Sequence, residues 1–137
     1  MVNIWVLFFA LHALVWCIGA EIVTTDGYAL LLDCGSTGSR SFVFRFTETL
    51  DTENDEKLIS RTVTPITTMK IKRGISSFAD ENSSEYAVAN HLMPMFVNAS
   101  LAIPIEKHAN TQVFIKGTAG MRLLPIKKQE EIWTNII

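Results

Sequence analysis

The stretch LLLDCGSTGSR, from Leu30 to Arg40, decides the fold. An apolar run from Tyr28 to Leu32 is typical of a buried strand, and it leads directly into an acid, Asp33. Gly35 and Gly38 then bracket two hydroxylated residues. The sequence therefore predicts a strand that runs straight into a tight turn rich in polar groups.

The residues of this turn are suited to binding an anion. Between the glycines, Ser36 and Thr37 offer hydroxyls and backbone N–H groups that can point at one phosphate. Arg40 adds a planar cation, and Asp33 can take a metal ion directly or through its water shell. A plain hairpin turn is the alternative, because it favours the same residue types. We favour a phosphate loop, because a second small-residue loop, Gly117 to Arg122, also follows a predicted strand.

The elements around these loops indicate an α/β fold. Ser41 to Phe46 and Leu58 to Val63 are β-leaning and should form a meander with the first strand, joined by a solvated loop at 51–57. Thr111 to Lys116 predicts a fourth strand. Pro125 is well placed at the first turn of a last helix.

A helix is expected between the third and fourth strands. Its apolar stripe would consist of Ala89, Leu92, Met93 and Phe96, at helical spacing. Pro94 should kink this helix or end its regular part. The preceding residues 69–76, MKIKRGIS, are interpreted as a basic connection.

Composition and motifs exclude several classes of function. The 137 residues supply one domain at most, and a formal net charge of −2 argues against nucleic-acid binding. The chain has no P-loop, no dinucleotide fingerprint and no G-x-S-x-G nucleophile motif. His91 and His108 stand alone, without a second ligand at metal spacing.

The N-terminus predicts entry into the secretory pathway. Residues 1–20 carry no Asp, Glu, Lys or Arg, and the apolar run from Ile4 to Ala20 is followed at once by Glu21. This pattern is typical of a signal peptide or signal anchor, and the sequence leaves cleavage and retention in the membrane both open. Residues 21–137 would then form the lumenal part.

Three residues bear on a lumenal location. Asn82 and Asn98 begin N-x-[ST] sequons and are glycosylation candidates, although Asn82 could instead cap a helix. Cys34 would be the one cysteine left outside the apolar segment, and a single thiol cannot form an internal disulfide.

The two loops resemble known motifs. DCGSTGSR, at Asp33 to Arg40, and GTAGMRLLP, at Gly117 to Pro125, look like the first and second conserved regions of the nucleoside triphosphate diphosphohydrolase (apyrase) family. With MKIKRGIS, they are most similar to its Golgi and lysosomal endomembrane branch. One departure is Arg73, where the branch usually has proline.

This resemblance implies the N-terminal part of a ribonuclease H-like, actin-like ATPase lobe, a mixed sheet with flanking helices. It implies hydrolysis of nucleoside di- or triphosphates, with UDP and GDP favoured, by metal-assisted attack of water in the endomembrane lumen. The cofactor would be Ca²⁺ or Mg²⁺, with Asp33 orienting the metal's waters. The implied phosphate ligands are Gly35, Ser36, Thr37, Gly38, Arg40, Thr118, Ala119 and Gly120.

The resemblance covers the family's first two regions. Its third region, which carries the general-base Glu, would lie beyond Ile137, so we expect an N-terminal fragment with little or no activity by itself. One alternative is an inactive lumenal phosphate-binding module. Another is a different nucleotide-binding protein of the actin-like superfamily.

Overall fold

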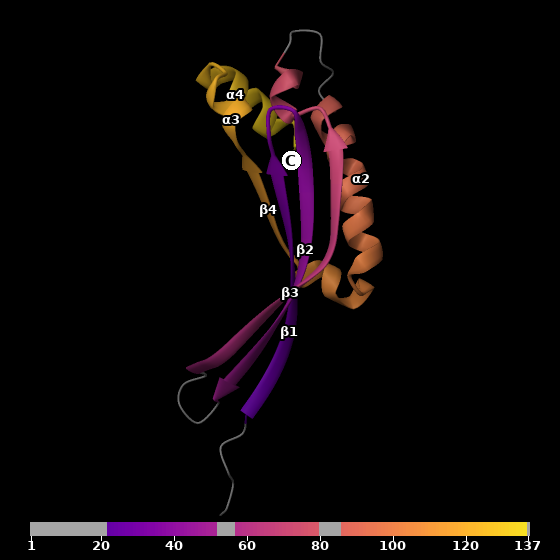
Figure 1. Ribbon diagram of the computed structural model, residues 1–137, viewed down its shortest axis with the longest axis vertical. Helices are drawn as coiled ribbons and strands as arrows, with labels where there is room; N and C mark the ends of the chain where they lie inside the picture. Colours follow the sequence, from indigo (N-terminus) through magenta and orange to yellow (C-terminus); the bar gives the residue numbers. More distant parts are fainter. Residues whose placement is uncertain (1–21, 52–56, 80–85, 137) are drawn as a thin grey trace, which may run out of the picture. The chain divides into compact units, whose positions relative to one another are not determined.

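The computed structural model describes residues 22–51, 57–79 and 86–136 (Figure 1). Its strands form a four-stranded sheet in the order β3-β2-β1-β4. The strands are β1 (Ile22–Cys34), β2 (Gly38–Asp51), β3 (Lys57–Lys72) and β4 (Gln112–Gly117). The helices are η1 (Ile75–Phe78), α2 (Ala87–Ala102), η2 (Ile105–Asn110), α3 (Ala119–Arg122) and α4 (Ile126–Thr134).

The sheet is mixed, as predicted. Short connections join β1 to β2 and β2 to β3, and connections of that length can link only antiparallel neighbours. The chain then passes through α2 and returns as β4, which lies parallel to β1. In their register Leu32 is opposite Ile115 and Cys34 is opposite Gly117, so the two strands end side by side.

The chain divides into two compact units. Of the described residues, 26–47 and 62–136 belong to the larger unit, which contains the core. The smaller unit contains 22–25, 48–51 and 57–61, where the Arg61 guanidinium pairs with the Glu48 carboxylate.

The core of the larger unit lies between the sheet and the helices, with α2 alongside the strands in Figure 1. Along β1, buried Leu30, Leu32 and Cys34 alternate with residues that are only half-buried, which is the period of a strand. Asp33 belongs to the second set, so it is on the face of the sheet opposite this core. The core consists of Leu30, Leu32, Cys34, Val43, Ile75, Val88, Leu92, Met95, Ala99, Ile103, Met121 and Ile132.

The structure corrects two details expected of α2. Of the two outcomes expected at Pro94, a kink or an end, the end is contradicted, because α2 continues to Ala102 with Met95 and Ala99 buried in the core. The buried stripe consists of Val88, Leu92, Met95 and Ala99, whereas the predicted Met93 is half exposed. The predicted stripe was therefore rotated from the buried face, although Leu92 is buried and Phe96 is partly buried against the core.

The interpretation of residues 69–76 as a connection was also wrong in its first half. β3 runs on to Lys72, well past the predicted end at Val63. Met69 and Ile71 pack against the core. The alternation of apolar and basic residues in MKIK was a strand signal, because side chains on a strand alternate between its two faces.

Other predictions agree with the structure or fall outside it. All four predicted strands form, and Pro125 immediately precedes α4. The N-terminal apolar segment, Asn82 and most of the 51–57 loop lie outside the described residues. No helix within the described ranges has the length and apolar character needed to cross a bilayer.

Two leucines on α2 test the assignment of its buried face. Leu92 is fully buried and Leu101 is 84% exposed. We expect Leu92→Ala to destabilise the protein by about 2–5 kcal/mol, because it leaves a cavity in the core. Leu101→Ala should stay within about 0.5 kcal/mol. Urea unfolding of the two variants measures the difference, and equal losses would contradict the assignment.

A charged cluster joins β1, β2 and η2 in the larger unit. The Arg45 guanidinium donates to Asp26 Oδ2 at 2.5 Å, and the Thr47 hydroxyl donates to Asp26 Oδ1 at 2.8 Å. The Lys107 ammonium donates to the Asp26 carbonyl oxygen at 3.3 Å. The hydrogen bonds from Arg45 and Thr47 lower the pKa of Asp26 below its ordinary value of 3.8.

This lowered pKa makes stability depend on pH. Since the folded state holds the Asp26 carboxylate ionised, its contribution is complete above about pH 3.8 and is lost as the pH falls through the lowered folded-state pKa. Asp26→Asn should therefore be less stable than the parent at pH 7 and equal to it in strong acid. Urea unfolding across this range measures the effect, and a difference that persists in acid would rule out the ionised carboxylate as its source.

Candidate phosphate-binding site

The first predicted loop is a tight turn between β1 and β2. β1 ends at Cys34 and β2 begins at Gly38, and the Gly35 N–H donates to the Gly38 carbonyl oxygen at 2.9 Å. Ser36 and Thr37 occupy the tip and are exposed. The turn therefore presents two hydroxyls to solvent at the end of the sheet.

Close packing explains the glycines near this turn better than backbone torsion does. No described glycine has a positive φ. A Cβ on Gly38 would lie 2.7 Å from the Ile71 carbonyl oxygen, and one on Gly74 would collide with the Gly35 carbonyl oxygen. Real Cβ atoms essentially never approach another atom this closely, so neither Gly38 nor Gly74 has room for a side chain.

The second predicted loop lies against the first because β4 is parallel to β1. The Thr118 N–H donates to the Cys34 carbonyl oxygen at 3.0 Å, and the Thr118 hydroxyl donates to the same oxygen at 3.3 Å. Ala119 opens the short helix α3. Gly120 packs behind the first loop, where an added Cβ would lie 2.9 Å from Ser36 Cα.

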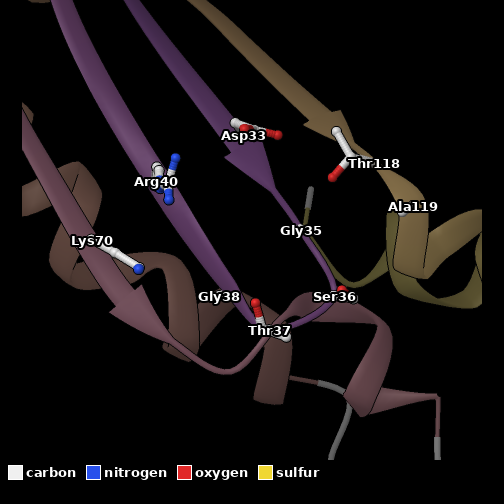
Figure 2. A pocket seen from close by; sticks show the side chains of 9 residues that line it. All are labelled: Asp33, Gly35, Ser36, Thr37, Gly38, Arg40, Lys70, Thr118 and Ala119. Atoms are coloured by element: carbon white, nitrogen blue, oxygen red, sulfur yellow. The ribbon is translucent and has the colours of Figure 1, made fainter.

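One pocket brings the two loops together. Figure 2 shows Asp33, Arg40 and Lys70 on the three strands β1, β2 and β3, with Thr118 at the end of β4. Gly120 is the one predicted phosphate ligand that does not line the pocket. The lining residues are Asp33, Gly35, Ser36, Thr37, Gly38, Arg40, Lys70, Thr118 and Ala119.

Two cations line this pocket, one of which sequence reasoning missed. Arg40 and Lys70 are both exposed, and neither makes a hydrogen bond or an ion pair within the described residues. Lys70 was missed because its segment was interpreted as a connection. Once MKIK is taken as a strand, Lys70 must lie on the face opposite Met69 and Ile71.

Asp33 fits a divalent cation held through water. Its Oδ1 atom is buried and has no hydrogen-bond partner, which is unusual for a carboxylate oxygen. The described residues contain no cluster of three His, Cys, Asp or Glu side chains that could hold a metal ion. One carboxylate beside several hydroxyls suits Ca²⁺ or Mg²⁺, because Mg²⁺ in particular keeps water ligands and shares substrate phosphates.

The remaining residues singled out from the sequence lie away from the pocket lining. Cys34 is buried, and burial raises the pKa of its thiol, which favours the unreactive protonated form. Asn98 lies inside α2, and its Oδ1 atom is buried without a hydrogen bond. The ring nitrogens of His91 and His108 are 2.9 Å from the carbonyl oxygens of Arg73 and Ile103, to which they donate.

Comparison with known proteins identifies the family. The sequence profile of the GDA1/CD39 (nucleoside phosphatase) family matches residues 20–137. The chain belongs to this family. The matched range includes both loops and all nine residues that line the pocket.

Several curated proteins resemble this member of the GDA1/CD39 family. Human ectonucleoside triphosphate diphosphohydrolase 7 is 38% identical over 129 residues, 85% of this chain and 20% of the human protein. Nucleoside-diphosphatase mig-23 of Caenorhabditis briggsae is 35% identical over 117 residues, 80% of this chain and 19% of the relative. Golgi apyrase of Saccharomyces cerevisiae is 36% identical over 118 residues, 80% of this chain and 18% of the yeast protein. The chain thus spans about a fifth of the length of these relatives.

A solved structure confirms the predicted fold class. The nucleoside triphosphate hydrolase structure from Neospora caninum matches with a TM-score of 0.62 at 13% sequence identity. The match covers 96% of this chain and 28% of the solved chain. At this identity the similarity establishes the fold alone, a mixed sheet with flanking helices.

Two glycine substitutions test the close packing behind the loop. Gly74→Ala should destabilise the protein by about 1–3 kcal/mol, the usual effect of overpacking, because its Cβ would collide with the Gly35 carbonyl oxygen. Gly35→Ala is the matched comparison, since its Cβ would lie 3.1 Å from the Gly38 carbonyl oxygen and needs only a small shift. Thermal unfolding should rank Gly74→Ala as the less stable variant, and the reverse order would contradict this packing.

Proposed function

We propose that this chain supplies the phosphate-binding part of an active site that hydrolyses nucleoside di- and triphosphates, with UDP and GDP favoured. The observation that carries the proposal is that Asp33, Arg40, Lys70 and the two loops line the same pocket. Two cations and several hydroxyls in one pocket suit a phosphate chain. Membership of a nucleoside phosphatase family supports the same conclusion.

Each lining residue has a proposed role toward the phosphates. Arg40 presents a rigid fork of N–H donors that can hold two oxygens of one phosphate, whereas Lys70 adds a flexible point charge. The Ser36 and Thr37 hydroxyls and the backbone of Gly35 and Gly38 would contact one phosphate. From the facing loop, Thr118 and the backbone of Ala119 would contact the next, with Gly120 behind them.

The proposed reaction is attack of water on the terminal phosphorus. A bond forms between the water oxygen and phosphorus, the phosphoanhydride P–O bond breaks, and a nucleoside diphosphate gives the monophosphate and inorganic phosphate. A Ca²⁺ or Mg²⁺ ion, when bound through water to Asp33, would neutralise phosphate charge. Arg40 and Lys70 would hold the phosphates in line and stabilise the charge that develops on them.

The base that takes the proton from water is proposed to come from another part of the protein. Asp33 is the one carboxylate that lines the pocket within the described residues, and it is assigned to the metal. The relatives are about five times longer than the matched region, so their sequences have room for a second carboxylate. This division leaves binding to this chain and proton transfer to the remainder.

Two relatives support the proposed substrate and location. One is named a nucleoside-diphosphatase and another a Golgi apyrase. With the apolar residues 1–20 as a signal peptide or anchor, the protein would act in the lumen of the secretory pathway, membrane-bound if the segment is retained. Glycans on Asn82 or Asn98 would be consistent with that location.

Phosphate release tests the proposed function. UDP, GDP and ATP, each with Ca²⁺ or Mg²⁺, are given to the 137-residue chain and to the longest protein product of the same gene. In the longer product, Arg40→Ala should lower kcat/KM by on the order of a hundredfold, the effect of removing one charge-stabilising donor. Lys70→Ala should lower it by about tenfold, because a lysine makes fewer directed contacts. Lys127→Ala, an exposed cation on α4, is the control and should change nothing.

The outcomes separate the enzyme from its alternatives. Activity in the longer product alone, lost with Arg40→Ala, supports an active site to which this chain contributes only part. Activity that survives Arg40→Ala would exclude the proposed pocket. No hydrolysis by either protein would overturn the proposal and favour a phosphate-binding module without catalysis.

A further inference from the structure

Arg73 has a backbone conformation that is unusual for its residue type. Its φ is 75°, and it is the one non-glycine among the described residues with a positive φ. Side chains disfavour this region, so surrounding contacts must hold it there. Proline is fixed near φ −65° and could not adopt this conformation. Arg73 and Gly74 form the junction between β3 and η1.

The strained residue contacts the phosphate loop through its backbone. The Arg73 N–H donates to the Thr37 carbonyl oxygen at 3.1 Å, and Thr37 is at the tip of the loop. This bond fixes the carbonyl group of the peptide that joins Thr37 to Gly38. Proline has no N–H and would lose the bond as well as the conformation.

Besides the bond to Thr37, Arg73 makes several contacts with residues of η1 and α2. Its carbonyl oxygen accepts a hydrogen bond from His91 Nε2 at 2.9 Å, and since a carbonyl can only accept, Nε2 carries the proton. Arg73 Nε donates to the Ser77 hydroxyl at 2.8 Å. Its guanidinium carbon lies 3.8 Å from the centre of the Phe78 ring, which also packs against the His91 ring at 5.1 Å. The junction is thus tied to both η1 and α2.

The next residue closes the junction against the loop. Gly74 is buried and packs directly beneath Gly35 and Ser36, with no space for a side chain. A displacement of Arg73 would therefore carry Gly74 with it and release the floor of the loop. The position of the loop depends on this junction although Arg73, Gly74 and His91 do not line the pocket.

We propose that Arg73 and His91 are positioning residues that hold the Gly35–Gly38 loop in its phosphate-binding geometry. The chain of contacts runs from α2 through the His91 imidazole to the Arg73 carbonyl, and from the Arg73 N–H to Thr37. A preorganised loop binds phosphate without first having to be ordered, so a variant whose loop is less ordered should bind phosphate more weakly. The proposal rests on the proposed function for its effect on turnover, but its structural part does not require a ligand.

The contacts that join His91, Arg73 and Thr37 are called the clamp below. Four variants of the longest gene product test it. Arg73→Pro removes both the N–H and the positive φ, whereas Arg73→Gly keeps both and loses only the side chain. His91→Ala removes the donor to the Arg73 carbonyl. His108→Ala is the matched control, because its Nε2 also donates to a backbone carbonyl, Ile103, at 2.9 Å, but from η2.

Two readouts separate the clamp from general stability and from the proposed function. The first is amide hydrogen exchange of the peptide around residues 30–40, measured without ligand. The second is kcat and KM for UDP. We expect faster loop exchange in Arg73→Pro and His91→Ala, with kcat/KM lowered between about tenfold and about a hundredfold, as for a misplaced binding group. Arg73→Gly and His108→Ala should stay within about threefold of the parent, well below that loss.

Each result decides the matter. Unchanged loop exchange in Arg73→Pro and His91→Ala overturns the clamp, whether or not the parent hydrolyses UDP. Faster exchange with unchanged kcat/KM overturns its role in phosphate binding. Equal damage in Arg73→Gly and Arg73→Pro overturns the assignment to the backbone. If the parent does not hydrolyse UDP but exchange rises as expected, the clamp stands and the proposed function fails.

Discussion

The parallel pairing of β1 with β4 is the constraint on which the rest of the structure depends. It places Cys34 opposite Gly117, so that two loops far apart in the sequence begin at the same edge of the sheet. Thr118 then donates both its N–H and its hydroxyl to the Cys34 carbonyl, which fixes the second loop to the first. Parallel pairing needs a long crossover, and α2 supplies it while covering the sheet. Both the core and the pocket therefore follow from the parallel pairing of β1 with β4.

Much of the fold could be predicted from local sequence patterns, because the strands have clear apolar runs or alternate apolar with polar residues. The apolar run before Asp33 identifies β1, and the alternation of Phe42 and Phe44 identifies β2. The rings of Phe42 and Phe44 stack on one face of the sheet, with their centroids 6.3 Å apart. The face of α2 was not predictable, because apolar residues occur on several sides of this helix. Met93 and Met95 are equally apolar, and only packing against the sheet decides that Met95 is buried. Tertiary contacts likewise let α2 continue past Pro94.

In the candidate site, the two loops could be recognised from the sequence, whereas the residues around them could not. Gly-, Ser- and Thr-rich segments after strands have a local signature, and their members meet in one pocket. Lys70 has no such signature, since its position depends on which face of β3 it occupies and on the pairing of β3 with β2. Arg73 was noticed as a departure, but its contacts with Thr37 and His91 involve backbone atoms that a side-chain pattern cannot indicate.

The distribution of charge around the loop follows from the alternation of the strands. Leu32 and Cys34 take the core positions of β1, so Asp33 between them has to face the other side. The same rule puts Arg40 between the buried Ser39 and Ser41 on β2, and Lys70 between Met69 and Ile71 on β3. Asp33, Arg40 and Lys70 consequently lie on the face opposite the core, where they line one pocket. The alternation that buries Leu32 and Cys34 in the core thus also gathers the charged side chains of the pocket on one face.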